Sequence, residues 1–140
     1  MANSYELKRA KEFELSVINF LNSHSSQSFS KRKVNLNGVM FEFDFVSDDG
    51  EIIGDAKFLK NIKVPAAKWD NISQYVWLLE HYKAKIKFMI FGNDREVPER
   101  YLKRFEPLTG DVEFYFFNNE HLDPLGTKGH YKLESILSTK

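Results

Sequence analysis

Two aspartates on either side of a predicted turn are the residues of this chain best suited to chemistry. Residues 47–50 read Ser-Asp-Asp-Gly, and an Asp-Gly pair is a strong signal for a β-hairpin. A two-residue loop at this turn places Asp44 directly opposite Asp55, and a four-residue loop makes the two residues diagonal neighbours. In both registers the carboxylates lie on one face of an antiparallel strand pair.

Two carboxylates side by side repel each other, and a divalent cation offsets that repulsion. Mg²⁺ is typically held by one or two carboxylates together with waters and a substrate phosphate, and Mn²⁺ is expected to substitute for it. Lys57 follows Asp55 by two residues and therefore points the same way. Its ammonium group can stabilise charge that develops on a phosphate, or hold the attacking water. These three residues predict a site that hydrolyses phosphodiesters.

The alternative is a solvated strand face with a ladder of charges. The two-residue loop also places Glu42 opposite Lys57, so Lys57 would then merely neutralise Glu42 or Asp55. The strand over residues 51–59 is apolar on nearly both faces, which is typical of a central strand. Burying charged side chains in a central strand costs free energy unless they are paired or bind an ion. The functional site is therefore the favoured interpretation.

Two further polar residues are candidates for the same site. Glu14 lies inside the apolar stripe of a predicted helix. It is either a third acidic group that leans over the sheet toward the metal, or an edge glutamate that reaches solvent or pairs with Lys11. Gln74 is either an exposed polar residue or an amide that reaches the substrate backbone or a metal-bound water.

Basic residues flank the hairpin, although the 20 basic and 20 acidic residues of the chain balance. This zero net charge counts mildly against nucleic-acid binding, but the distribution of charge matters more than its sum. A basic strip could contact phosphates, or it could simply be solvated. The strip consists of Lys31, Arg32, Lys33, Lys60 and Lys63. Trp77 is either a ring that stacks on bases or a core residue, and its apolar neighbours favour the core.

Hydrophobic periodicity predicts the elements that position these residues. In the strand that opens at Gly38, Phe41, Phe43 and Phe45 are expected on one face, with Glu42 and Asp44 on the other. Helices are predicted over residues 4–22, 68–82, 98–105 and near 131–137. Strands are predicted over 51–59, 85–91 and 112–117, with a short strand or extended segment over 31–37. Mixed order of this kind indicates an α/β sheet with helices on its faces.

Composition bounds the remaining possibilities. A chain of 140 residues with 42% hydrophobic residues fits one domain, residues 1–140, with a real core. Cysteine is absent, so disulfides and thiolate–zinc sites are excluded. No apolar run approaches the roughly 20 residues of a membrane span, and the first residues do not resemble a signal peptide. A cytoplasmic protein that does not act at a membrane is expected.

These motifs resemble the PD-(D/E)XK nuclease superfamily, which includes many restriction enzymes. The matching pieces are Phe13-Glu14, Phe43-Asp44, Asp55-Ala56-Lys57 and Gln74-Tyr75. The resemblance implies a restriction-endonuclease-like αβββαβ core, with a central mixed sheet flanked by helices. It also implies Mg²⁺-dependent cleavage of DNA, or sometimes RNA. Asp44 and Asp55 would bind the metal, Lys57 would position water, and Glu14 would be an auxiliary acid. The sequence departs from the pattern at Phe43, where the family name has proline, and Asp55 replaces the commoner glutamate.

Three hypotheses follow. The first is a small Mg²⁺-dependent nuclease, acting on DNA more than on RNA. At this length it would lack a recognition domain, so a homodimer or a targeting partner is expected. The second is a catalytically inactive domain of the same fold that binds protein or nucleic acid. The third is an unrelated α/β protein, in which Asp44 and Asp55 would lie apart and solvated.

Overall fold

The fold of the chain alternates helices with strands of one sheet. The computed structural model describes residues 4–59 and 66–137. The helices are α1 (Ser4–His24), α2 (Ala66–Glu80), α3 (Glu96–Phe105), the 3₁₀ turn η1 (Glu106–Leu108) and α4 (Lys132–Ile136). The strands are β1 (Phe29–Leu36), β2 (Val39–Ser47), β3 (Ile52–Phe58), β4 (Ile86–Gly92), β5 (Val112–Phe117) and β6 (Leu122–Leu125). Every predicted helix and strand is present, with ends shifted by a few residues, and β6 was not predicted.

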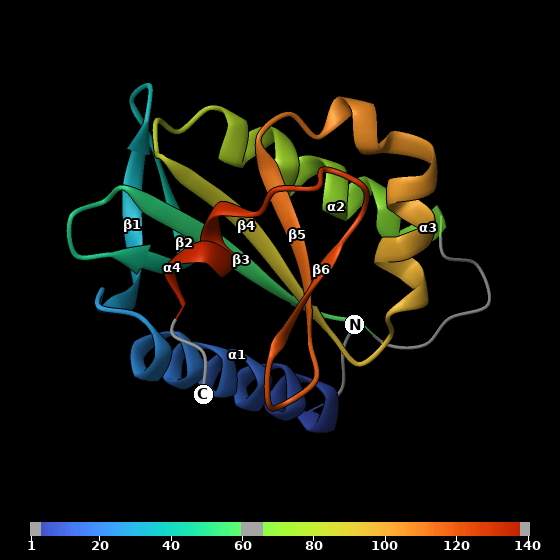
Figure 1. The fold of residues 1–140 in the computed structure, drawn as a ribbon, viewed down its shortest axis with the longest axis horizontal. Helices are drawn as coiled ribbons and strands as arrows, with labels where there is room; N and C mark the ends of the chain where they lie inside the picture. Colours follow the sequence, from blue (N-terminus) through green and yellow to red (C-terminus); the bar gives the residue numbers. More distant parts are fainter. Residues whose placement is uncertain (1–3, 60–65, 138–140) are drawn as a thin grey trace.

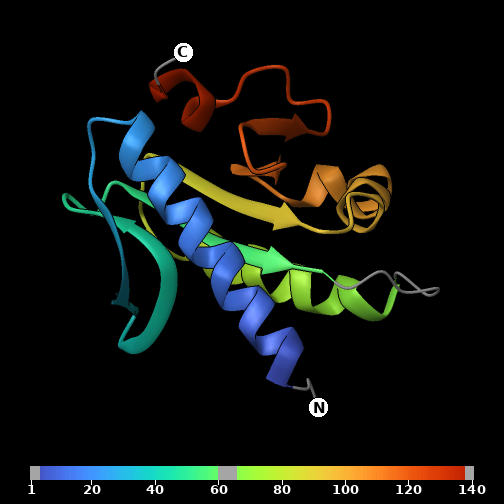
Figure 2. The same cartoon turned by 90° about the horizontal axis from the view of Figure 1, so that it is seen from below.

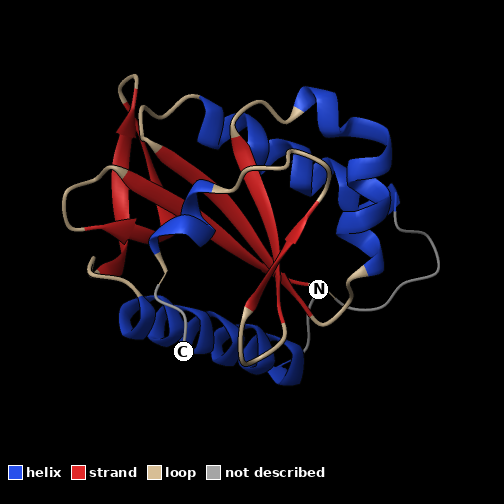
Figure 3. Ribbon diagram, viewed as in Figure 1, coloured by secondary structure: helices blue, strands red, loops and turns tan. Residues whose placement is uncertain are grey.

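The strands form one six-stranded mixed sheet in the order β1-β2-β3-β4-β5-β6 (Figure 3). The central strands β3, β4 and β5 run parallel, while β1, β2 and β6 pair antiparallel at the two ends. The α/β prediction, with a mixed sheet flanked by helices, is therefore confirmed. The predicted central place of the Asp55 strand is confirmed too, because β3 has a neighbour on each side.

Helices cover both faces of the sheet (Figures 1 and 2). On one face α1 buries Phe13, Val17 and Leu21, and α4 buries Leu133, in one apolar cluster with residues of the strands. On the other face α2 and α3 bury a second cluster. Burying each such side chain contributes about 1.5–3 kcal/mol, so both layers hold the strands in place. We call the two faces the α1 side and the α2 side.

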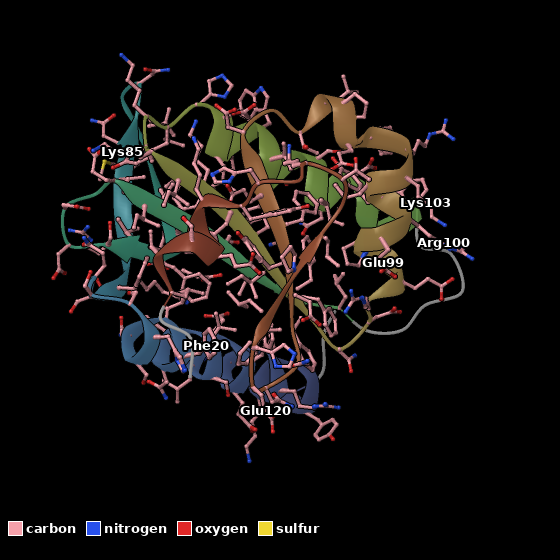
Figure 4. All side chains as sticks on the ribbon, in the orientation of Figure 1. Phe20, Lys85, Glu99, Arg100, Lys103 and Glu120 are labelled. Carbon is pink, nitrogen blue, oxygen red and sulfur yellow. The ribbon has the colours of Figure 1, made fainter. Side chains whose placement is uncertain are left out.

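The polar faces of the helices point to solvent. Glu99, Arg100 and Lys103 of α3 point away from the sheet (Figure 4). Trp77 of α2 was expected in the core, and this prediction is wrong, since its side chain is 61% exposed. The buried stripe of α2 consists of Ile72, Val76 and Leu79. Trp77 lies outside that stripe, and its ring contacts His81 at a centroid distance of 4.4 Å.

Candidate active site

The turn between β2 and β3 fixes the register of the candidate site. The backbone N–H of Gly50 donates to the carbonyl of Ser47 at 2.9 Å, and Gly50 has a φ of 72°, which glycine adopts without strain. Ser47 Oγ donates to Asp49 at 2.7 Å and accepts from the N–H of Ile52 at 3.0 Å. These bonds set the pairs Val46 with Ile53 and Phe45 with Gly54. This is the register that the two-residue loop predicts, although the strand ends leave four residues between them.

The pairing of β2 with β3 ends at the two aspartates. The backbone N–H of Asp44 donates to Asp55 Oδ1 at 3.1 Å, and the N–H of Ala56 donates to Asp44 Oδ2 at 2.9 Å. Each carboxylate therefore takes the place of a carbonyl in the strand ladder. The predicted opposition of Glu42 and Lys57 is wrong, because the ladder has already ended and Glu42 pairs with β1 instead.

A β-bulge lies at the same point on the other edge of β2. Lys31 of β1 is opposite two residues of β2, Asp44 and Phe45. The pairs that flank this irregularity are Ser30 with Val46 and Arg32 with Phe43. Bulges bend a strand, re-aim its side chains and are frequent next to active sites. This bulge brings Lys31 beside Asp44.

The bulge also corrects the expected faces of β2. Phe41 and Phe43 pack in the α2-side cluster, whereas Phe45 packs in the α1-side cluster. The prediction that all three phenylalanines share one face is therefore wrong. The physical reason is that an extra residue in a bulge interrupts the period of two.

Each aspartate keeps one carboxylate oxygen free of the backbone, and that oxygen faces a lysine. Asp44 Oδ1 lies 3.5 Å from Lys31 Nζ, and Asp55 Oδ2 lies 3.6 Å from Lys57 Nζ. Lys31 Nζ also donates to Glu14 Oε1 of α1 at 2.9 Å. The cluster therefore contains three carboxylates and two ammonium groups, from α1 and the first three strands.

The electrostatics of the cluster are dominated by burial. Asp55 is 4% exposed. Its burial, followed by the negative charge of Asp44, raises the pKa of the Asp55 carboxyl well above its usual range. Burial also lowers the pKa of the Lys57 ammonium, although Asp55 and Asp44 oppose this effect. An ionised Asp55 therefore needs more positive charge than Lys57 alone supplies.

Tyr75 of α2 completes the surroundings of Lys57. Lys57 Nζ lies 3.3 Å from the centroid of the Tyr75 ring, a cation–π contact. Burial, and then the charge of Asp55, raises the pKa of the Tyr75 hydroxyl, which therefore stays neutral. The Tyr75 ring thus fixes the lysine on the α2 side, while Glu14 approaches the cluster from α1.

The carboxylate oxygens of the two aspartates are suitable ligands for a magnesium ion. Their free oxygens are hard ligands, and Mg²⁺ needs only one or two carboxylates because it keeps several waters. Within residues 4–59 and 66–137, no group of three or more His, Cys, Asp and Glu side chains is arranged to hold a metal. The predicted third ligand, Glu14, is instead bonded to Lys31. Asp44 and Asp55 are therefore the residues that would hold the ion.

The remaining predicted residues lie around this cluster or away from it. Glu14 pairs with Lys31, which also contacts Asp44, rather than with Lys11. Gln74 is exposed on α2, and no hydrogen bond or ion pair within the described parts of the chain joins it to the aspartates.

The basic strip is exposed on the edge strand. Lys31, Arg32 and Lys33 are exposed on β1, and the Arg32 guanidinium donates to the carbonyl of Ser47. Lys60 and Lys63 lie outside the described residues.

Sequence reasoning missed the place of two residues in the cluster. Tyr75 was named beside Gln74 without a role of its own, and its contact with Lys57 depends on how α2 crosses the sheet. Lys31 was predicted only as a phosphate contact. Its place beside Asp44 depends on the bulge, which no sequence pattern here indicates.

Comparisons with protein-family models, with curated proteins and with solved structures found no match to this chain. In the part of the chain that the structure describes, no helix has the length and apolar character needed to cross a membrane.

Proposed function

We propose that this protein is a Mg²⁺-dependent nuclease that hydrolyses phosphodiester bonds, in DNA more than in RNA. Asp44 and Asp55 hold the metal in this proposal, and Lys57 positions water. The observation that carries it is the pair of aspartates, each anchored by a backbone N–H through one oxygen and leaving the other free. Such anchoring preorganises ligands before a metal or substrate arrives.

The element order supports the same proposal. The chain runs through α1, β1, β2, β3, α2 and β4 in that order. This order agrees with the αβββαβ core that the resemblance to PD-(D/E)XK nucleases implies. A restriction-endonuclease-like core is therefore part of the proposal, together with the roles of the residues it carries.

Each residue of the cluster has a task in the proposed reaction. A bound Mg²⁺ ion supplies Lewis-acid stabilisation of the charge that develops on the phosphate. Lys57, held by Asp55 and by the Tyr75 ring, positions the water or donates a hydrogen bond to the phosphate. Gln74 is proposed only as a contact to the substrate backbone.

The basic strip on β1 is the proposed contact for nucleic acid. Lys31, Arg32 and Lys33 are exposed on the strand next to Asp44, so they can reach phosphates that flank the scissile bond. Lys60 and Lys63 remain candidates for the same role. A homodimer or a targeting partner is proposed to contribute to recognition of the substrate.

One observation favours a second candidate function. Lys31 Nζ and Lys57 Nζ each lie against an aspartate oxygen that accepts no backbone N–H, so these oxygens have protein cations as partners. A domain in which these ion pairs are permanent would bind protein or nucleic acid without cleaving it. The two candidates differ in whether the aspartates bind a divalent ion.

Metal-dependent cleavage tests the proposal. The wild type and Lys57→Ala are incubated with plasmid, single-stranded DNA and RNA, in Mg²⁺, Mn²⁺ or EDTA. Cleavage is expected only with metal, and Lys57→Ala should lower its rate by about 10²–10³-fold. Lys85→Ala is the matched control, since it removes an exposed lysine that pairs with Glu51 at the far end of β3. Cleavage that persists in EDTA would contradict the proposal, and an absence of Mn²⁺ binding would favour the second candidate.

A further inference from the structure

We infer that Lys31 fills the position of a second cation, so that this site takes up a single divalent ion. The inference rests on the proposed function, because it concerns how many metal ions the proposed nuclease site holds. Two-metal nuclease sites hold their ions about 3.5–4 Å apart. Here the second positive charge would belong to the protein.

The contacts of Lys31 are those of a bridging cation. Its Nζ lies 2.9 Å from Glu14 Oε1 and 3.5 Å from Asp44 Oδ1. These oxygens come from α1 and β2, which are far apart in the sequence, and Lys31 joins them from β1. Lys57 differs, because it contacts one carboxylate and an aromatic ring.

The two aspartates make the same kinds of contact, so the surroundings of Lys31 and Lys57 can be compared directly. Each aspartate accepts a backbone N–H with one oxygen and faces an ammonium group with the other. Lys57 occupies the buried end of this arrangement, with 16% of its side chain exposed, and Lys31 the open end, with 47% exposed. An ion pair at an exposed position is weak, so Lys31 can also turn toward a phosphate when the substrate arrives.

The charge of the cluster fits one divalent ion. The carboxylates of Glu14, Asp44 and Asp55 outnumber the ammonium groups of Lys31 and Lys57 by one. One divalent ion and the single negative charge of a phosphodiester then bring the site to neutrality. A second ion would leave an excess of positive charge unless Lys31 were removed.

The β-bulge is what makes this arrangement possible. Lys31 is the single residue of β1 opposite two residues of β2, and one of these is Asp44. A lysine carries a compact charge on a flexible stem with three hydrogen-bond donors, so it can follow a leaving oxygen without an ideal coordination geometry. Lys31 is thus assigned as a positioning residue for the phosphate, in place of a metal ion.

Counting bound Mn²⁺ tests the inference without a measurement of cleavage. Calorimetry and electron paramagnetic resonance would be applied to the wild type, Lys31→Met, and Lys31→Met combined with Glu14→Gln. The methionine keeps the apolar stem and removes the charge. We expect one ion in the wild type, two in Lys31→Met with the spin coupling of neighbouring ions, and one again in the double variant. Lys85→Met is the control that removes an exposed, ion-paired lysine elsewhere, and it should bind one ion.

The outcomes separate this inference from the proposed function. One ion in both the wild type and Lys31→Met would overturn the role of Lys31 and leave the Asp44 and Asp55 metal site standing. Two ions in the wild type would also overturn it. No bound Mn²⁺ in either protein would overturn the proposed function together with the inference.

Discussion

Glu113 of β5 and Asp55 of β3 are buried carboxylates of one sheet, and both are 4% exposed. Glu113 is surrounded by donors. It accepts the Tyr115 hydroxyl at 2.7 Å and the backbone N–H groups of Lys132 and Leu133, at the start of α4, at 2.8 and 3.0 Å. Its charge is therefore stabilised by hydrogen bonds that the fold itself provides.

Asp55 has far less support at the same depth. It accepts one backbone N–H, from Asp44, and it faces the Asp44 carboxylate as well as the more distant Lys57. Equal burial thus has opposite consequences. Glu113 anchors a helix, while the fold leaves an ionised Asp55 incompletely paired. Incomplete pairing at a buried carboxylate is typical of a site that takes up a cation or reacts.

Removing the well-supported carboxylate should have the largest effect on stability. Glu113→Ala leaves three donors without an acceptor, two of them buried and one partly buried, and removes the hydrogen bonds that join α4 to β5. At about 1–3 kcal/mol for each unsatisfied group, we expect a loss of about 3 kcal/mol or more in the free energy of unfolding. Urea denaturation measures this loss.

The exposed Glu99→Ala is the control, and its cost should stay within about 0.5 kcal/mol. A cost below about 1 kcal/mol for Glu113→Ala would mean that the hydrogen bonds to α4 contribute little.

Asp55, the carboxylate with few hydrogen-bond donors, should make the free energy of unfolding depend on pH. The change is expected to be smaller than the loss in Glu113→Ala. The pKa of Asp55 is raised in the folded state, so the folded protein keeps a proton that the unfolded chain releases above its pKa of about 3.9. This contribution to the free energy of unfolding is complete below the pKa of the unfolded chain, and it is lost as the pH rises through the pKa that Asp55 has in the folded protein. In EDTA, the free energy of unfolding of the wild type should therefore fall between pH 4 and 7 relative to that of Asp55→Asn. If the free energy of unfolding changes with pH in the same way for the two proteins, the raised pKa of Asp55 is contradicted.

Much of the candidate site could be predicted because it depends on local pattern. The Asp-Gly turn and the alternation beyond it determine which residues of β2 and β3 meet, and Asp44 and Asp55 do meet. They are neither apart nor solvated, as an unrelated charged hairpin would require. Glu14 could be singled out because a carboxylate in an apolar helical stripe is unusual.

The remainder depends on contacts between distant segments. The bulge opposite Lys31 is a feature of the pairing of β1 with β2, and no sequence pattern indicates it. The short β6 contains Pro124, and a proline argues against a strand when only the sequence is known. The role of Glu113 could not be predicted either. Two of its three hydrogen-bond donors belong to α4, about 20 residues further along the chain.

The measurement that tests the central claim most directly is the stability of the wild type and Asp55→Asn, in EDTA and in Mn²⁺ near pH 7.5. At a concentration of Mn²⁺ 100 times the dissociation constant, we predict a stabilisation of the wild type by about 2.7 kcal/mol. Asp55→Asn should gain none, and in EDTA it should be at least as stable as the wild type, because it removes a buried charge beside Asp44. If Mn²⁺ leaves the wild type unchanged while Asp55→Asn is destabilised, Asp55 is a structural carboxylate like Glu113, and the nuclease proposal is wrong.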